Sequence, residues 1–184
     1  MFPVRRPTAS AWSGPLPEKA CLSVNVTILN EDYRDMLQSL SDEKVKFLLV
    51  GAYALAAHGY PRATMDIDIW VMPSPENADA VLRALKRFGA SLRDLTKQDL
   101  QTEGIVFQIG IAPRRIDIIT TASGLKFDET FNRSISVDIE RIRVRIPTLD
   151  DLILNKRAVG RTKDTADAEA LEALRDSEQK RLPT

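Results

Sequence analysis

The chain has 184 residues, of which 43% are hydrophobic and 28% charged, a composition ordinary for a globular protein with one sizeable core. Lys and Arg together number 26, as do Asp and Glu, so net charge points to neither a nucleic-acid nor a membrane partner. The single cysteine, Cys21, excludes an internal disulfide and a cysteine-based metal cage, and its isolation favours a cytoplasmic location. No apolar run reaches membrane-spanning length, and we expect no membrane partner.

The order of apolar runs and breaks predicts an α+β (mixed α/β) fold. Residues 1–25 are rich in Pro, Ser and Ala, so we expect a disordered or loosely packed tail there and a single domain over residues 26–184. The predicted elements are, in order, a helix after Asn30, a strand over 46–50, a short helix over 51–58, a strand over 65–72, a helix over 76–88, a strand hairpin over 105–109 and 115–120, a helical turn over 127–133, a second hairpin over 134–139 and 142–146, and helices over 149–159 and 162–177. This order indicates a mixed sheet flanked by helices, with further helices at the C-terminal end.

Two carboxylates stand one residue apart in the predicted strand MDIDIWVM. Asp66 and Asp68 point to the same face of that strand because side chains alternate with a period of two. Like charges on one face repel, so such a pair needs a metal ion or a basic partner. There are two alternatives to a metal site: a solvated edge strand, or a pair of acids that is ion-paired with Arg62 and Arg115.

A third acid, Asp117, stands between apolar neighbours in the predicted strand over 115–120. If that strand lies beside the Asp66 strand, three carboxylates converge on one face of the sheet. Carboxylate oxygens suit Mg²⁺, and two such ions would polarise an attacking hydroxyl and stabilise a leaving pyrophosphate. Gly51, at the start of a predicted helix, provides room and backbone N–H groups for a phosphate tail.

Together these features resemble the nucleotidyltransferase superfamily, which has a polymerase β-like fold. The resemblance rests on a Gly–small pair after a strand, Asp-x-Asp on the next strand and a later strand Asp. The segments GAYALAAHGYPRATMDIDIWV and LDDLILNKRAVGRTKD are similar to small bacterial nucleotidyltransferases of the AbiEii-like type, some of which act as toxins. The resemblance implies transfer of a nucleoside monophosphate from an NTP to a hydroxyl of tRNA, a protein or a small molecule, and in the toxin case an antitoxin protein as partner.

The resemblance also implies a role for individual residues. Asp66 and Asp68 would bind Mg²⁺, with Asp117 as a third ligand or general base. The implied nucleotide-binding residues are Gly51 and Ala52 at the triphosphate, Arg62 and Thr64 at a phosphate or the ribose, and Lys156 at the triphosphate, oriented by Asp164.

One residue departs from the pattern. The family often has Gly-Gly or Gly-Ser at the turn, where the Ser hydroxyl donates to a phosphate, whereas this chain has Gly51-Ala52. The loss of that hydroxyl motivates an alternative function, a catalytically inactive nucleotide-binding or regulatory module on the same fold. An aminoglycoside-type nucleotidyltransferase is a further alternative.

The single histidine and a row of three arginines stand apart from the predicted site. His58, the single histidine, is expected to cap a helix end or to hydrogen-bond a loop carbonyl. Arg141, Arg143 and Arg145 alternate on one strand face and are either solvated or form a basic stripe for an acceptor nucleic acid.

Overall fold

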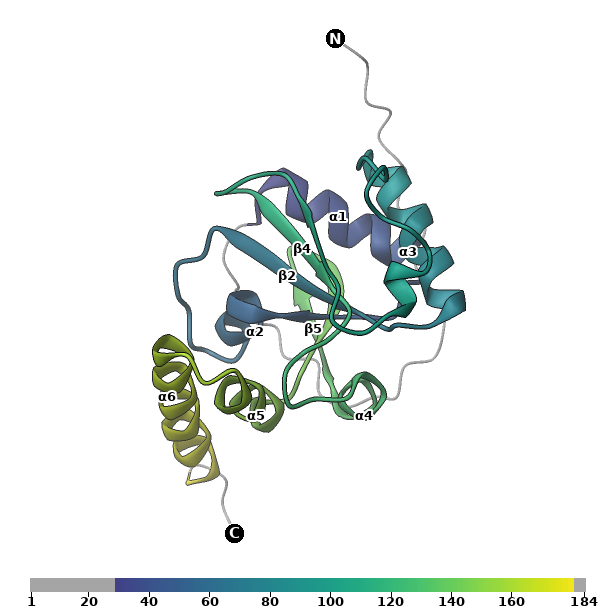
Figure 1. Cartoon of the computed structure of the whole chain (residues 1–184). Coiled ribbons are helices and arrows are strands. Elements are labelled where there is room, and N and C mark those ends of the chain that lie inside the picture. The colour runs from purple at the N-terminus through teal and green to yellow at the C-terminus, as the bar shows by residue number, and fades with distance from the viewer. Residues whose placement is uncertain (1–28, 181–184) are drawn as a thin grey trace.

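The computed structural model describes residues 29–180, apart from the side chain of residue 178 (Figure 1). The tail predicted over residues 1–25 lies outside the described residues and stays a prediction. Within the described part, the helices and strands agree in type and order with those expected, and the class is α+β.

The central sheet has four strands in the order β1-β2-β4-β3. The strands are β1 (Phe47–Val50), β2 (Asp66–Val71), β3 (Val106–Ile109) and β4 (Arg115–Ile119). Strand β2 pairs parallel with β4, while the other two pairings are antiparallel, so the sheet is mixed as predicted. Because β2 is an inner strand, the alternative in which its acids lie on an edge strand is wrong.

The remaining elements surround this sheet. Strands β5 (Ile135–Ile139) and β6 (Ile142–Ile146) form a separate hairpin, and β6 contacts β1. The helices are α1 (Glu31–Asp42), α2 (Gly51–Ala57), α3 (Pro75–Phe88), α4 (Phe127–Arg133), α5 (Leu149–Val159) and α6 (Thr162–Gln179), with a 3₁₀ turn over Asp99–Gln101. Figure 1 shows α1 and α3 together on one side of the molecule and the packed pair α5–α6 away from them. None of the described helices is both long and apolar enough to cross a membrane.

The two faces of the sheet bury different residues. On one face, Leu49 and Ile69 pack into the main core, to which α1 and α3 contribute. On the other face, Trp70 packs edge-on against Phe127 of α4, with ring centroids 5.1 Å apart. Asp66 and Asp68 share this second face with Trp70 because they alternate along the same strand. One end of this face is therefore apolar and the other carries the acids.

Helix α3 is fixed to the sheet by one buried amide. Asn77 is 6% exposed. Its side-chain oxygen accepts from the Lys46 N–H at 2.8 Å, and its nitrogen donates to the carbonyls of Lys46 and Met72, each at 3.0 Å. The amide thus satisfies backbone groups at adjacent ends of β1 and β2, where the sheet ladder stops.

We expect Asn77→Ala to lower the free energy of unfolding by about 1–3 kcal/mol, because it removes three hydrogen bonds of a buried amide and leaves the Lys46 N–H without its partner. Urea denaturation measures the change. The matched control is Asn155→Ala, which removes one exposed hydrogen bond to the Ser123 carbonyl and should cost about 1 kcal/mol or less. Equal losses in the two variants would contradict the role assigned to Asn77.

Candidate active site

The pairing of β2 with β4 brings the three predicted carboxylates together. In this parallel register Asp68 lies opposite Asp117, and Asp66 lies opposite Arg115. Matched positions of neighbouring strands present their side chains on the same face, so Asp66, Asp68 and Asp117 converge. The expectation that the strand of Asp117 lies beside the strand of the other two acids is confirmed.

The acids open into a cavity of about 250 Å³ between the sheet, the start of α2 and the α5–α6 pair. All eight residues predicted for the site line this one cavity, namely Gly51, Ala52, Arg62, Thr64, Asp66, Asp68, Asp117 and Lys156. Arg115, Arg161 and Lys163 line it as well. Three carboxylates therefore face five cationic side chains across one small space, an arrangement suited to an anionic ligand held beside a cation.

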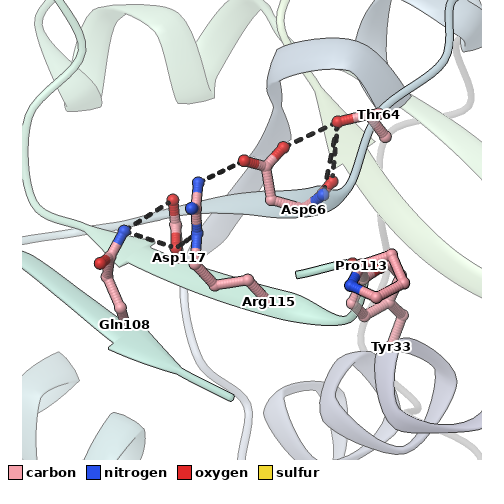
Figure 2. A network of polar contacts seen from close by, with 7 residues as sticks. All are labelled: Tyr33, Thr64, Asp66, Gln108, Pro113, Arg115 and Asp117. Atoms are coloured by element: carbon pink, nitrogen blue, oxygen red, sulfur yellow. Dashed lines mark hydrogen bonds and ion pairs between the residues drawn. The ribbon is translucent and has the colours of Figure 1, made fainter. Parts of the chain in front are cut away.

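Arg115 bridges two of the three acids (Figure 2). Its Nε donates to Asp117 Oδ1 at 2.9 Å, and its Nη2 donates to Asp66 Oδ2. The other oxygen of Asp66 accepts from the Thr64 hydroxyl at 2.7 Å, and Asp117 also accepts from Gln108 at 3.2 Å. The interpretation of Arg115 as an ion-pair partner is thus confirmed for Asp66, whereas Arg62 pairs with a different acid.

Asp68 is the acid that Arg115 does not bridge. Burial and the neighbouring charges of Asp66 and Asp117 together raise the pKa of Asp68 to about 6, although the cations nearby act in the opposite direction. Its carboxylate lies against the backbone of Gly51, where an added Cβ would stand 2.0 Å from Asp68 Oδ2. Gly51 also has a φ of +63°, in the left-handed region. Both the backbone conformation and the room for Asp68 therefore require glycine at this position.

Lys156 and Arg62 belong to a second ionic cluster at the edge of the cavity. Lys156 Nζ lies 2.9 Å from Asp164 Oδ1 and 3.3 Å from Asp167 Oδ2, and Arg62 pairs with Asp167. Burial alone would raise the pKa of Asp164, but hydrogen bonds from Arg161 and Lys156 outweigh it and hold the pKa below its usual value. Lys156 therefore faces the cavity as part of a network that ties α5 and α6 to the loop before β2, with Asp164 as its predicted partner.

The structure also shows what His58 and the arginines of β6 contact. His58 Nε2 donates to the Pro147 carbonyl at 2.9 Å, which confirms the expected bond to a loop carbonyl. Arg145 stacks over Phe131 and donates to two backbone carbonyls, and Arg143 pairs with Asp138, so both make contacts within the fold, while the basic stripe stays one of the two predicted alternatives.

Sequence reasoning missed three residues around the site and named a fourth, Arg115, only as an ion-pair partner of the acids. Arg115 had a usable signal, because it precedes Asp117 by two residues on one strand and so shares its face. Gln108 reaches Asp117 only through the register of the β3–β4 hairpin. Arg161 lies in the turn between α5 and α6 and Lys163 in the first turn of α6, and no local pattern indicates which elements these side chains will approach.

The chemistry of the donor set fits Mg²⁺, since three carboxylates on one face offer the hard oxygen ligands that this ion prefers. The three carboxylates do not, however, surround a metal-binding point as they stand. Among the described residues, no three His, Cys, Asp or Glu side chains are already disposed around a point that would hold a metal ion. The guanidinium of Arg115 lies between two of the three ligands instead.

We expect Gly51→Ala to lower the free energy of unfolding by more than about 2 kcal/mol, since it combines left-handed strain with a collision against Asp68. Gly59→Ala is the matched control. Gly59 has a φ of +88° with nothing within 4 Å of an added Cβ, so its substitution should cost about 1–2 kcal/mol from strain alone. In a protein that also carries Asp68→Ala, the difference between Gly51→Ala and Gly59→Ala in unfolding free energy should be smaller. Equal costs for the two glycines in the native background would contradict the collision.

In the metal-free protein we expect Asp68 to titrate near pH 6, and Asp117→Asn to lower this pKa because one like charge is removed. Since the folded state holds the proton more tightly than the unfolded state, this group makes the protein less stable as pH rises from about 4 to about 6. Carbon-13 NMR of the side-chain carboxyls measures the pKa. An Asp68 pKa near 4 in the native protein would contradict the prediction.

Comparison with known proteins agrees with this geometry. Residues 25–179 match the model of a family described as nucleotidyltransferase of unknown function (DUF6036). No curated protein matches the sequence significantly. The matched segment covers all eight predicted site residues and every described helix and strand. The chain therefore belongs to this nucleotidyltransferase family.

Proposed function

We propose that the protein transfers a nucleoside monophosphate from an NTP to an acceptor hydroxyl and releases pyrophosphate, with Mg²⁺ as cofactor. The observation that carries the proposal is the placement of three carboxylates on adjacent parallel strands, facing five cations across one cavity. The carboxylates would hold two Mg²⁺ ions, and the cations would hold the triphosphate, which carries several negative charges. Family membership supports the same reaction class.

In this proposal Asp66, Asp68 and Asp117 would hold the metal. When bound, Mg²⁺ supplies charge that polarises the acceptor hydroxyl and stabilises the leaving pyrophosphate. The acceptor oxygen forms a bond to the α-phosphorus as the bond to the pyrophosphate oxygen breaks, and Asp117 takes the hydroxyl proton as general base. Asp117 is only 6% exposed, so bulk water has little access to the proton it accepts.

The remaining lining residues would position the nucleotide. Lys156 is 12% exposed at its side chain and directs its ammonium group to the cavity edge, where Asp164 and Asp167 hold it in place. Thr64 is held by its hydrogen bond to Asp66, close to a ribose or phosphate group. Gly51 and Ala52 would contribute backbone N–H groups to the triphosphate, because the first turn of α2 has no side-chain cap.

For the acceptor, we propose an RNA end such as that of tRNA, on the similarity to AbiEii-like proteins. An antitoxin protein would then be a partner. The alternative of a catalytically inactive nucleotide-binding module is favoured by one observation, Ala52, which lines the cavity without the hydroxyl that the family often places there.

The test is incubation with each labelled NTP, Mg²⁺ and total tRNA, with an aminoglycoside and bulk protein as separate acceptors. We expect label in one acceptor, and a fall of at least about 100-fold in Asp66→Asn and Asp68→Asn, which each lose a metal ligand. The matched control is Asp79→Asn, an exposed carboxylate on α3 that pairs with Lys97 and lies outside the cavity. Its activity should be unchanged.

Label that persists in both site variants would refute the assigned site. Nucleotide binding by calorimetry without label in any acceptor would favour the inactive module. Label in the aminoglycoside alone would replace the RNA acceptor with a small molecule.

A further inference from the structure

We propose that Arg115 is a built-in substitute for a metal ion, which holds Asp66 and Asp117 together in the metal-free protein and must leave before a divalent cation can bind them. This inference rests on the proposed function in one respect, since it takes the three carboxylates as a cation site. It assigns Arg115 as a positioning residue that competes with the cation.

The first support is the geometry of the bridge. Arg115 starts β4 directly opposite Asp66 and two residues before Asp117, so its side chain rises from the same face between the two acids. One guanidinium edge contacts both carboxylates, Nε on Asp117 and Nη2 on Asp66 (Figure 2). Charge-assisted contacts of this kind are about twice as strong as neutral hydrogen bonds.

The second support is that the carboxylate oxygens of Asp66 and Asp117 already accept hydrogen bonds. Both oxygens of Asp66 accept hydrogen bonds, from Thr64 and from Arg115, and both oxygens of Asp117 accept from Gln108 or Arg115. Mg²⁺ needs its oxygens at about 2.1 Å, closer than any donor nitrogen approaches. A cation shared by Asp66 and Asp117 would therefore require the oxygens that Arg115 holds.

The third support is charge. A guanidinium does not deprotonate in proteins, so Arg115 cannot release the two carboxylates by losing a proton. A divalent ion placed beside it would meet its positive charge at close range as well as the occupied oxygens. The Arg115 side chain is 33% exposed, so it can move away from the two acids toward solvent while its backbone stays in the sheet. Arg115 and the cation thus exclude one another, which couples them negatively.

The test measures binding of Mn²⁺ alone, without nucleotide, by electron paramagnetic resonance of the free ion. We expect Arg115→Gln to bind Mn²⁺ at least about tenfold tighter than the native protein, because each of the two charge-assisted contacts no longer broken is worth about a factor of ten. Removing any nearby positive charge also strengthens cation binding. Lys163→Gln controls for this effect, because Lys163 lines the same cavity but bridges no carboxylates, and it should bind less than about threefold tighter.

Arg115→Lys provides a second variant in case the first folds poorly. Lysine keeps the charge but lacks the planar fork that spans two carboxylates, so its Mn²⁺ affinity should lie between those of the native protein and Arg115→Gln. The thermal unfolding temperature is a further measurement that does not depend on the Mn²⁺ affinities. Without metal, Arg115→Gln should unfold at a lower temperature than the native protein, and Mg²⁺ should raise its midpoint by more than it raises that of the native protein.

The native protein can be examined directly by NMR. The Arg115 Nε–H signal, protected by the bond to Asp117, should lose that protection when Mg²⁺ saturates the site. Persistence of the protected signal at saturating Mg²⁺ would overturn the proposal. So would an Arg115→Gln affinity for Mn²⁺ no greater than that of Lys163→Gln, or failure of every variant to bind Mn²⁺.

These results are separable from those of the transfer assay. If Arg115→Gln tightens Mn²⁺ binding but no acceptor is labelled, the exchange stands and the proposed reaction fails. If an acceptor is labelled while Mn²⁺ affinity does not depend on Arg115, the reaction stands and the exchange fails.

Discussion

The parallel pairing of β2 with β4 is the constraint on which the rest of the site depends. It places three carboxylates on one face of the sheet, where their mutual repulsion must be offset within a partly buried space. The protein meets this demand in two ways. Arg115 neutralises Asp66 and Asp117 through direct contacts, and Asp68, which lacks such a contact, retains its proton more readily than an ordinary aspartate. The repulsion among the three acids is therefore reduced by one guanidinium and by the raised pKa of one carboxyl.

The turn into α2 shows how one residue meets several requirements. Gly51 adopts a left-handed conformation that turns the chain from β1 directly into α2, and its missing side chain leaves room for the Asp68 carboxylate. A phosphate-binding role, which the sequence pattern predicts for this glycine, would add to these structural demands. The Asp68 carboxylate requires glycine at this position whether or not a nucleotide binds. The presence of Gly51 alone is therefore no evidence of catalytic activity.

The α5–α6 pair supplies the opposite wall of the cavity. The Asp164 side chain is fully buried and accepts from Lys156 and Arg161, and Asp167 accepts from Arg62, so these two acids of α6 pair with three of the five lining cations. Arg115, a fourth, pairs with Asp66 and Asp117. A buried ion pair contributes less to stability than its geometry suggests, because desolvation offsets much of the attraction. Its effect here is positional, since it holds Lys156 and Arg62 at the cavity edge. Among the described side chains, Lys163 is the lining cation without an acidic partner.

Most of the fold was predictable from the sequence, because helices and strands follow local signals. Asn30 and Thr148 cap the starts of α1 and α5, Gly89 ends α3, and alternation along β2 places both acids on one face. Gly51, Ala52, Asp66 and Asp68 could be predicted for a related reason, since the Gly turn and Asp-x-Asp are short motifs within one contiguous segment, and Asp117 stands alone among apolar residues of a strand. The family resemblance supplied Arg62, Thr64 and Lys156. Gln108, Arg161 and Lys163 were not predicted, because their places at the site depend on the register of β3 with β4 and on how α5 and α6 dock.

The sequence by itself determined which residue types meet at the site: carboxylates, a small turn and a lysine on a later helix. Only the tertiary structure decided how their charges are balanced. Arg115 reaches across 49 residues to Asp66, and Arg62 reaches across 105 residues to Asp167. Such pairings depend on strand order, register and helix docking, which bring distant charges within contact range, and the spacing of residues along the chain carries no record of them.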